Sequence, residues 1–281
     1  MLTVGQILQH SAGRLAAAGI ETSRLDARLL LAEVMGMEPQ RLSMRAHLEP
    51  SPAEIERFGA LLGRRLNREP MSQVLGRRGF WTLELAVSAD TLTPRPDTET
   101  VVEAVLSILP DRGRPRRILD LGTGTGCILL ALLSELGYST GLGIDRSEAA
   151  LAVAGRNAGT LGLAGRASFR IGDWGGGLDG TFDVIVSNPP YIPDGDIDAL
   201  APEVSRFEPR LALAGGADGL DCYRALAPDL ARLLAPDGVA ALEVGAGQAA
   251  EVAGLMAAAG LCPREIRRDL GGIERCIVVS L

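Results

Sequence analysis

From residue 101 onward, short apolar segments, glycine turns and helical segments follow one another in a regular order. The apolar segments have the length of buried strands, and the segments between them carry apolar residues at helical spacing. We predict strands over residues 117–121, 141–145, 169–172, 182–187, 239–244 and 277–281, and helices over 127–136, 148–161 and 223–234. Because such alternation builds a largely parallel sheet with helices on both faces, the predicted fold class is α/β.

Residues 1–93 differ from the rest of the chain in charge and in pattern. They hold 11 arginines and 10 acidic residues, whereas the remainder holds 17 arginines and 25 acidic residues. Apolar residues recur at helical spacing from residue 4 to 34, and Ser51-Pro52-Ala53-Glu54 is typical of a capped helix start. Residues 71–92 alternate partly as strands do. We therefore expect a small helical bundle followed by a β segment.

The charged residues exclude several kinds of chemistry. The formal net charge is −7, and all 28 basic residues are arginines, so the sequence contains no lysine. Schiff-base catalysis and the Walker phosphate loop both need a lysine and are excluded. The larger part of the chain is acidic, and only 4% of all residues are aromatic. These features argue against binding to duplex or single-stranded nucleic acid, so no direct nucleic-acid binding is expected.

Metal-binding and membrane-directed features are also scarce. The chain has two histidines, and its four cysteines form no Cys-x-x-Cys pair, so we expect no metal site and reduced thiols. The longest uninterrupted apolar run, residues 127–133, is far shorter than a membrane span, and no targeting segment is recognised. The expected location is cytoplasmic, without membrane association.

The first predicted strand of the α/β part leads into the run Asp-Leu-Gly-Thr-Gly-Thr-Gly, which opens a helix. Glycines let the backbone approach a ligand closely, and a helix N-terminus offers free N–H groups. A carboxylate at the end of the second strand can accept the hydroxyls of a ribose. The predicted site for an adenosine-containing ligand comprises Gly122, Thr123, Gly124, Thr125, Gly126 and Asp145. These residues alone do not separate a nicotinamide cofactor from a methyl donor.

Asp173 and Trp174 follow the third predicted strand, at the same edge of the sheet. An indole and a carboxylate suit an adenine ring, whereas the alternative is a tryptophan that only covers the sheet edge. The fourth strand runs into Asn188-Pro189-Pro190-Tyr191. Two prolines fix this loop, which therefore presents the Asn188 amide oxygen and the Pro189 carbonyl as acceptors for a planar –NH2 group.

These two motifs together resemble the methyltransferases that use S-adenosylmethionine to modify amide or amino nitrogens. More closely, the chain resembles the HemK/PrmC family, the N5-glutamine methyltransferases of peptide-chain release factors. The matching segments also include residues 80–81, 93–99, 206–209, 218–221 and 269–275. The resemblance covers essentially the whole chain. It implies a Rossmann-like methyltransferase sheet over residues 94–281, a β-hairpin connector over 76–93, and a small N-terminal helical-bundle domain over 1–75 that recognises the substrate.

The resemblance also implies a role for each motif. S-adenosylmethionine would be bound by residues 122–126, Asp145, Asp173, Trp174 and Asn188. The substrate glutamine, in the Gly-Gly-Gln motif of a class I release factor, would be held by Asn188, Pro189, Pro190 and Tyr191, with Asn188, Pro189 and Tyr191 as the catalytic residues. Arg95 and Glu99 would lie near the domain junction, although Asp97 or Thr98 is as well explained as the cap of the next helix. A monomer is expected.

Other functions remain as alternatives. A ribosomal-protein glutamine methyltransferase shares the same motifs, and an adenine-N6 DNA methyltransferase uses a similar Asn-Pro-Pro-Tyr loop on a flipped base. The acidic catalytic part argues against the DNA enzyme. A nicotinamide-dependent oxidoreductase or a non-catalytic adenosine-binding module would explain the glycine turn but not the Asn188 loop.

Overall fold

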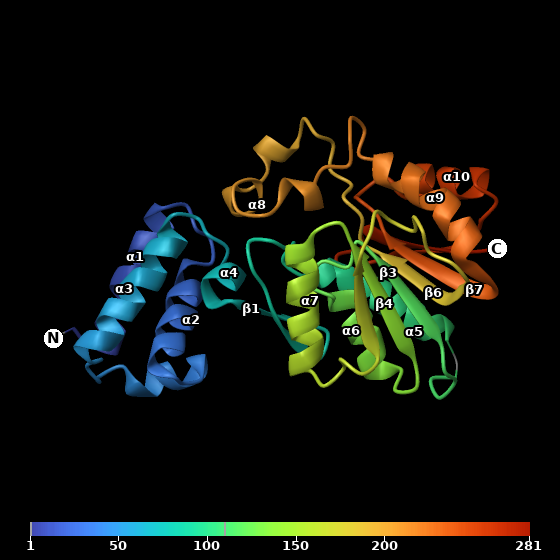
Figure 1. Cartoon of the computed structure of the whole chain (residues 1–281). Helices are drawn as coiled ribbons and strands as arrows, with labels where there is room; N and C mark the ends of the chain where they lie inside the picture. The colour runs from blue at the N-terminus through green and yellow to red at the C-terminus, as the bar shows by residue number, and fades with distance from the viewer. Residues whose placement is uncertain (1, 110) are drawn as a thin grey trace. The chain divides into compact units, whose positions relative to one another are not determined.

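The computed structural model describes residues 2–109 and 111–281, which form two compact units (Figure 1). The first unit contains residues 2–76 together with Ala201–Phe207. The second contains Arg77–Leu200 and Glu208–Leu281. No helix within the described residues combines the length and the apolar character that a membrane span needs.

The first unit is a helical bundle in which local sequence sets two of the helix starts. Thr3 caps α1 (Val4–Ala17) and Ser51 caps α3 (Pro52–Leu66), each in a capping box with the residue three positions later. The helix start predicted at Ser51 is therefore confirmed. The apolar helix faces pack into one core around residues such as Leu30. The other helices are α2 (Ser23–Met35), the 3-10 helix η1 (Pro39–Arg45), α4 (Met71–Leu75) and α8 (Pro202–Ser205).

The prediction of β structure from residue 71 onward was wrong at its start. Met71–Leu75 forms the short helix α4, which ends at Gly76. Gly76 has a φ of 72°, a left-handed conformation that glycine adopts without strain and that commonly ends a helix. The strands begin at the next residue, where β1 (Arg77–Phe80) and β2 (Leu83–Ala86) pair antiparallel as a hairpin.

The second unit is built on a seven-stranded sheet with the strand order β5-β4-β3-β6-β7-β9-β8. The pairs from β5 to β7 are parallel, whereas β9 pairs antiparallel with both β7 and β8. The predicted mostly parallel α/β sheet is thus confirmed. Its strands are β3 (Arg117–Leu121), β4 (Thr140–Asp145), β5 (Ala167–Ile171), β6 (Phe182–Ser187), β7 (Leu234–Glu243), β8 (Cys262–Arg268) and β9 (Glu274–Ser280).

Helices cover both faces of this sheet (Figure 1). One buried cluster contains residues of α5, α6 and α7, and the other contains residues of α9 and α10. The strands β3 and β6 contribute to both clusters, so the middle of the sheet is buried on both sides. The bounds are α5 (Glu99–Ile108), α6 (Cys127–Glu135), α7 (Glu148–Thr160), α9 (Asp221–Leu233) and α10 (Ala249–Ala258), with the 3-10 helices η2 (Pro96–Thr98), η3 (Ile197–Ala199) and η4 (Arg210–Ala212) in connections.

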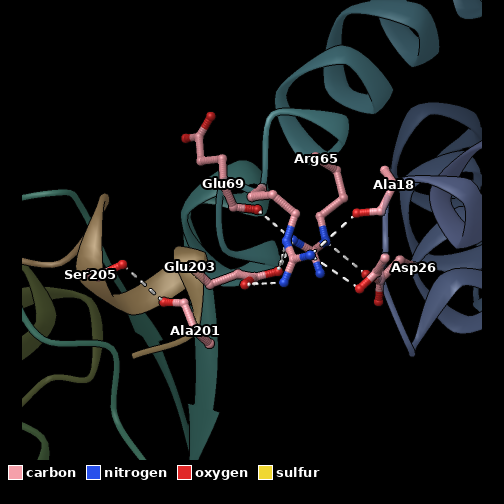
Figure 2. A network of polar contacts seen from close by, with 9 residues as sticks. Ala18, Asp26, Arg65, Glu69, Ala201, Glu203 and Ser205 are labelled. Atoms are coloured by element: carbon pink, nitrogen blue, oxygen red, sulfur yellow. Dashed lines mark hydrogen bonds and ion pairs between the residues drawn. The ribbon is translucent and has the colours of Figure 1, made fainter. Parts of the chain in front are cut away.

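The segment Ala201–Phe207 belongs to the first unit, although its neighbours in sequence belong to the second. Its Glu203 carboxylate accepts from Arg65 Nη1 at 2.9 Å and from Arg68 Nη2 at 2.7 Å (Figure 2). Arg65 is buried, and its Nε also donates to Asp26 at 2.8 Å. Burial opposes ionisation of Glu203, but the hydrogen bonds from Arg68 and Arg65 outweigh it and lower the pKa of Glu203 to about 2. The ion pairs of Glu203 with Arg65 and Arg68, here called the charged clasp, therefore hold the segment against the helical bundle.

Candidate functional site

A cavity lies at the carboxyl ends of the parallel strands of the second unit. The glycine turn, the end of the second parallel strand, the Asp173-Trp174 pair and the Asn188 loop all contribute to it. The predicted residues that line it are Gly122, Thr123, Gly124, Thr125, Asp145, Asp173, Trp174, Asn188 and Pro190. Three other predicted residues, Gly126, Pro189 and Tyr191, lie next to lining residues in the chain but do not line the cavity themselves.

The glycine turn after β3 has a backbone that only glycine adopts easily. Gly122, Gly124 and Gly126 have φ values of 74°, 53° and 80°. A Cβ at Gly122 would lie 3.4 Å from the ring of Trp174, so the indole packs directly against the backbone of the turn. Gly126 immediately precedes α6, whose first N–H groups have no partner within the helix. The turn therefore suits close approach of a polar ligand to backbone N–H groups.

Asp145 ends β4 and stiffens the glycine turn. Its Oδ2 accepts from the Gly124 N–H, and its Oδ1 accepts from the Ser147 N–H, both at 2.9 Å. Each carboxylate oxygen can accept more than one hydrogen bond. Because Asp145 also lines the cavity, it has acceptor capacity for ligand hydroxyls, as a ribose contact requires.

Asp120 lies buried beneath the same turn. Its Oδ2 accepts from the Thr123 hydroxyl at 2.6 Å. Burial raises the pKa of Asp120 to about 7, and the nearby Asp145 charge adds to the rise. The side chain therefore supports the turn from below rather than facing the cavity as an ordinary surface carboxylate.

Trp174 follows β5 in a conformation that is uncommon for its residue type. Its φ is 49°, in the left-handed region. The next residue is fixed in place, because the Gly175 N–H donates to Asp229 Oδ2 at 2.9 Å and the Gly175 carbonyl accepts from Arg232 Nη2 at 2.9 Å. The indole and the neighbouring Asp173 both form part of the cavity wall.

Asn188 follows β6 and has a fixed orientation. Its Nδ2 donates to the Thr98 hydroxyl oxygen at 3.1 Å, so the amide nitrogen points toward Thr98. Both side chains line the cavity. With the nitrogen engaged, the carbonyl oxygen of the Asn188 amide is left as the acceptor for a ligand.

Tyr191 turns toward the end of β7. Its hydroxyl donates to Oε1 of Glu243 at 3.2 Å, and its main-chain carbonyl accepts from Gln248 Nε2 at 3.0 Å. Burial raises the pKa of the Tyr191 hydroxyl, with the Glu243 charge as the next cause, so this hydroxyl stays protonated. Sequence reasoning missed Glu243, because it lies 52 residues from Tyr191 in a strand that otherwise looks like core.

The contacts before α5 correct the capping prediction. Neither Asp97 nor Thr98 caps α5: the helix has no side-chain cap hydrogen bond. Asp97 instead pairs with Arg275 at 3.2 Å, and Thr98 accepts from the Asn188 amide. Glu99 Oε1 accepts from the backbone N–H of Trp81 at 2.8 Å.

Arg95 lines the cavity and is held by a carboxylate from a distant segment. Its Nη2 lies 2.6 Å from Oε2 of Glu208, whose side chain is buried. Burial raises the pKa of Glu208, although the Arg95 charge opposes the rise. Sequence reasoning placed both residues in matching segments but did not predict their pairing, because they lie 113 positions apart.

A mostly parallel sheet that carries a glycine turn, an acidic strand end and a proline-braced Asn-Pro-Pro-Tyr loop on one cavity is the architecture of an S-adenosylmethionine-dependent methyltransferase. Residues 114–255 match the family model of a methyltransferase domain, and residues 6–76 match that of the PrmC N-terminal domain. The chain belongs to the release factor glutamine methyltransferase family.

Relatives support this assignment along the full chain. A release factor glutamine methyltransferase of Rhodospirillum rubrum is 54% identical over 277 residues, which are 99% of this chain and 85% of that protein. One from Cereibacter sphaeroides is 46% identical over 98% of this chain and 97% of its own. The crystal structure of a ribosomal protein L11 methylase from Lactobacillus delbrueckii subsp. bulgaricus has a TM-score of 0.50, covering 66% of this chain and 79% of that one. At 19% identity, this last likeness shows the fold alone.

Proposed function

We propose that the protein transfers a methyl group from S-adenosylmethionine to the side-chain amide nitrogen (N5) of the glutamine in the Gly-Gly-Gln motif of class I release factors. The observation that carries this proposal is the orientation of Asn188. Its Nδ2 is bound to Thr98, and its carbonyl oxygen is left for an N–H donor at the cavity. A substrate amide –NH2 is such a donor.

The residues around the cavity fit the proposed methyl donor. S-adenosylmethionine, when bound, supplies an electrophilic methyl group on a positively charged sulfur. The glycine turn would approach the methionine part, and the Asp145 carboxylate would accept the ribose hydroxyls. The Trp174 indole would lie along the adenine, beside Asp173. Each of these side chains lines the same cavity, and the turn has the positive φ angles that close approach needs.

The Asn188 loop would prepare the substrate nitrogen. An amide nitrogen is a poor nucleophile because its lone pair is delocalised into the carbonyl. If Asn188 Oδ1 and the Pro189 carbonyl each accept one N–H, the nitrogen gains electron density and its lone pair points at the methyl group. Such positioning replaces a strong base, because the surplus proton leaves during or after the transfer. Loss of the positive charge on sulfur favours the reaction in a site that excludes water.

The helical unit is proposed as the part that recognises the release factor. Residues 1–75 would form this substrate-recognition domain, residues 76–93 the connector and residues 94–281 the methyltransferase domain. The match of residues 6–76 to the PrmC N-terminal domain supports this division of labour. A cytoplasmic location is part of this proposal, because translation ends in the cytoplasm.

The test is mass spectrometry of an unmethylated class I release factor after incubation with the protein and S-adenosylmethionine. The expected result is one added methyl group on the motif glutamine. A release factor with alanine in place of that glutamine serves as the control and should stay unmodified. Methylation of purified ribosomal proteins, or of duplex DNA, with an unmodified release factor would overturn the proposal in favour of the corresponding alternative enzyme.

A further inference from the structure

Glu243 is a fully buried carboxyl group directly behind the Asn188 loop. It is the last residue of β7, and its side chain is 1% exposed. The strand holds it rigidly, because Glu243 pairs with Cys276 of β9 and its main-chain carbonyl accepts from the Tyr223 hydroxyl at 2.9 Å. A carboxyl group is costly to bury, so a position of this kind needs an explanation beyond packing.

The side chain of Glu243 binds Tyr191 at one end of the loop, and it also interacts with Thr98, which binds Asn188 at the other end. Its Oε1 accepts from the Tyr191 hydroxyl at 3.2 Å. The Thr98 hydroxyl, which accepts from Asn188 Nδ2, also interacts with the Glu243 carboxyl and lowers its pKa. Among the described residues, Oε2 of Glu243 is buried without a hydrogen-bond partner.

Burial and the groups around Glu243 together set its pKa near neutral pH. Burial raises its pKa to about 7, while Thr98, Tyr191 and the Arg275 charge oppose the rise and Asp97 adds to it. The titratable groups that interact with it are Asp97, Cys127, Tyr191, Tyr223, Arg275 and Cys276.

We propose that Glu243 is a positioning residue that sets the direction of the hydrogen bonds reaching Asn188. An ionised carboxylate only accepts, so the Thr98 hydroxyl hydrogen turns toward Glu243 and its lone pairs turn toward Asn188. Asn188 must then donate its Nδ2 to Thr98 and present Oδ1 to the substrate. Through the Tyr191 hydroxyl, the same carboxylate holds the other end of the loop. The catalytic consequence of this arrangement rests on the proposed function.

Glu243→Gln tests the charge with little change in shape. A glutamine side chain both donates and accepts, so Thr98 can donate to Asn188 Oδ1 and the Asn188 amide can turn over. We expect kcat on the release factor to fall about 10- to 100-fold, as for a displaced reacting group, with KM for S-adenosylmethionine nearly unchanged. In the native enzyme kcat should fall below pH 7 as Glu243 takes up a proton, and this acid limb should be absent in the variant.

Matched variants separate positioning from stability. Tyr223→Phe removes a buried hydrogen bond to the main chain of the same residue, so it should keep both kcat and the acid limb. In Thr98→Val, kcat should fall as far as it does in Glu243→Gln. Thr98→Ser retains the hydroxyl, so its kcat should stay close to the native value. If Glu243→Gln keeps the native kcat and acid limb, or if Tyr223→Phe loses as much kcat, the positioning role is refuted.

A spectroscopic measurement decides the same question without the substrate. The side-chain amide protons of Asn188, assigned by their loss in Asn188→Ala, should shift in the NMR spectrum with a midpoint near pH 7. The shift should persist in Tyr223→Phe and disappear in Glu243→Gln. Native enzyme that shows this titration but leaves the release factor unmodified would refute the proposed function alone, whereas an Asn188 amide that does not titrate would refute the role of Glu243.

Discussion

Asn188 has one of its two side-chain hydrogen-bonding groups engaged within the protein. The amide nitrogen is bound to Thr98, so only the oxygen remains for the substrate. Asn188→Ala should therefore lower kcat by about 100-fold or more, comparable with the loss of one positioned group in other active sites. Binding of S-adenosylmethionine, measured by calorimetry, should survive because the glycine turn and Asp145 are unchanged.

The control for this variant is Ser187→Ala, one residue earlier. The Ser187 hydroxyl is buried and donates to the Leu121 carbonyl at 2.6 Å, so its removal costs stability without removing an acceptor from the cavity. We expect it to retain most of kcat. An Asn188→Ala enzyme with native turnover would exclude the amide from the chemistry.

Asp120 makes the stability of the fold depend on pH in a definite direction. Its native pKa is about 7, against an ordinary value of 3.8 in the unfolded chain. Between these values the native state holds a proton that the unfolded state has lost, so this group lowers stability progressively as the pH rises from about 4 to 7. Above pH 7 the loss is complete.

Asp120→Asn removes that dependence. The fall in unfolding free energy between pH 5 and pH 8, measured by urea denaturation, should be smaller in the variant by about 3 kcal/mol. Asparagine can still accept from the Thr123 hydroxyl, so the bond to the turn is kept. The Glu243 contribution is common to both proteins and cancels. Equal pH slopes would show that Asp120 is ionised in the native state at pH 5.

At the scale of elements, Glu203 fastens α8 to the helical bundle. Glu203→Ala leaves Arg65 paired with Asp26 but removes both carboxylate contacts to Ala201–Phe207. Because the Glu203 side chain is only 20% exposed, we expect the segment to open more easily by about 2 kcal/mol. Amide hydrogen exchange over residues 201–207 should quicken accordingly.

Glu69→Ala is the matched control for that variant. Glu69 pairs with Arg64 in the same bundle, and among the described residues its carboxylate binds none in Ala201–Phe207. Exchange over residues 201–207 should therefore stay close to native in this variant. Equal acceleration in both variants would mean that general loosening of the bundle, rather than the clasp, governs the segment.

The elements that sequence predicted well are those whose pattern is local. β3, β4 and β6 are apolar runs followed by turns, and the runs themselves mark them as buried strands. β8 was not predicted, because six of its seven residues are exposed and an edge strand of that kind carries no apolar alternation. The glycine turn and the Asn188 loop were likewise visible as short contiguous motifs.

Contacts across long sequence separations could not be predicted in this way. Thr98 lies 90 residues from Asn188, and Glu203 lies 138 residues from Arg65. Nothing in the local sequence around these side chains points to the distant partner, and only the folded chain brings the partners together. The cavity could therefore be predicted, but not the polar side chains that hold its loop in place.

On the scale of the whole molecule, the proposed function assigns donor binding and substrate recognition to different parts of the chain. Every residue that lines the cavity lies between residues 90 and 222 and outside the segment 201–207, so all of them belong to the second unit. The helical bundle has its own hydrophobic core, and the charged clasp of Glu203 lies within it. Binding of the donor should therefore slow amide hydrogen exchange in the second unit only.

Amide hydrogen exchange of the full chain with and without S-adenosylmethionine tests this division. At a donor concentration about 100 times its Kd, the binding-competent unit gains about 2.7 kcal/mol. We expect slower exchange over residues 121–126, 145–150 and 172–175, and unchanged exchange over α1, α2 and α3. An unmethylated release factor added afterwards should in contrast protect the helical unit, because that unit is the proposed recognition domain. Protection of α1 to α3 by the donor alone would contradict the assignment of the donor site to the second unit.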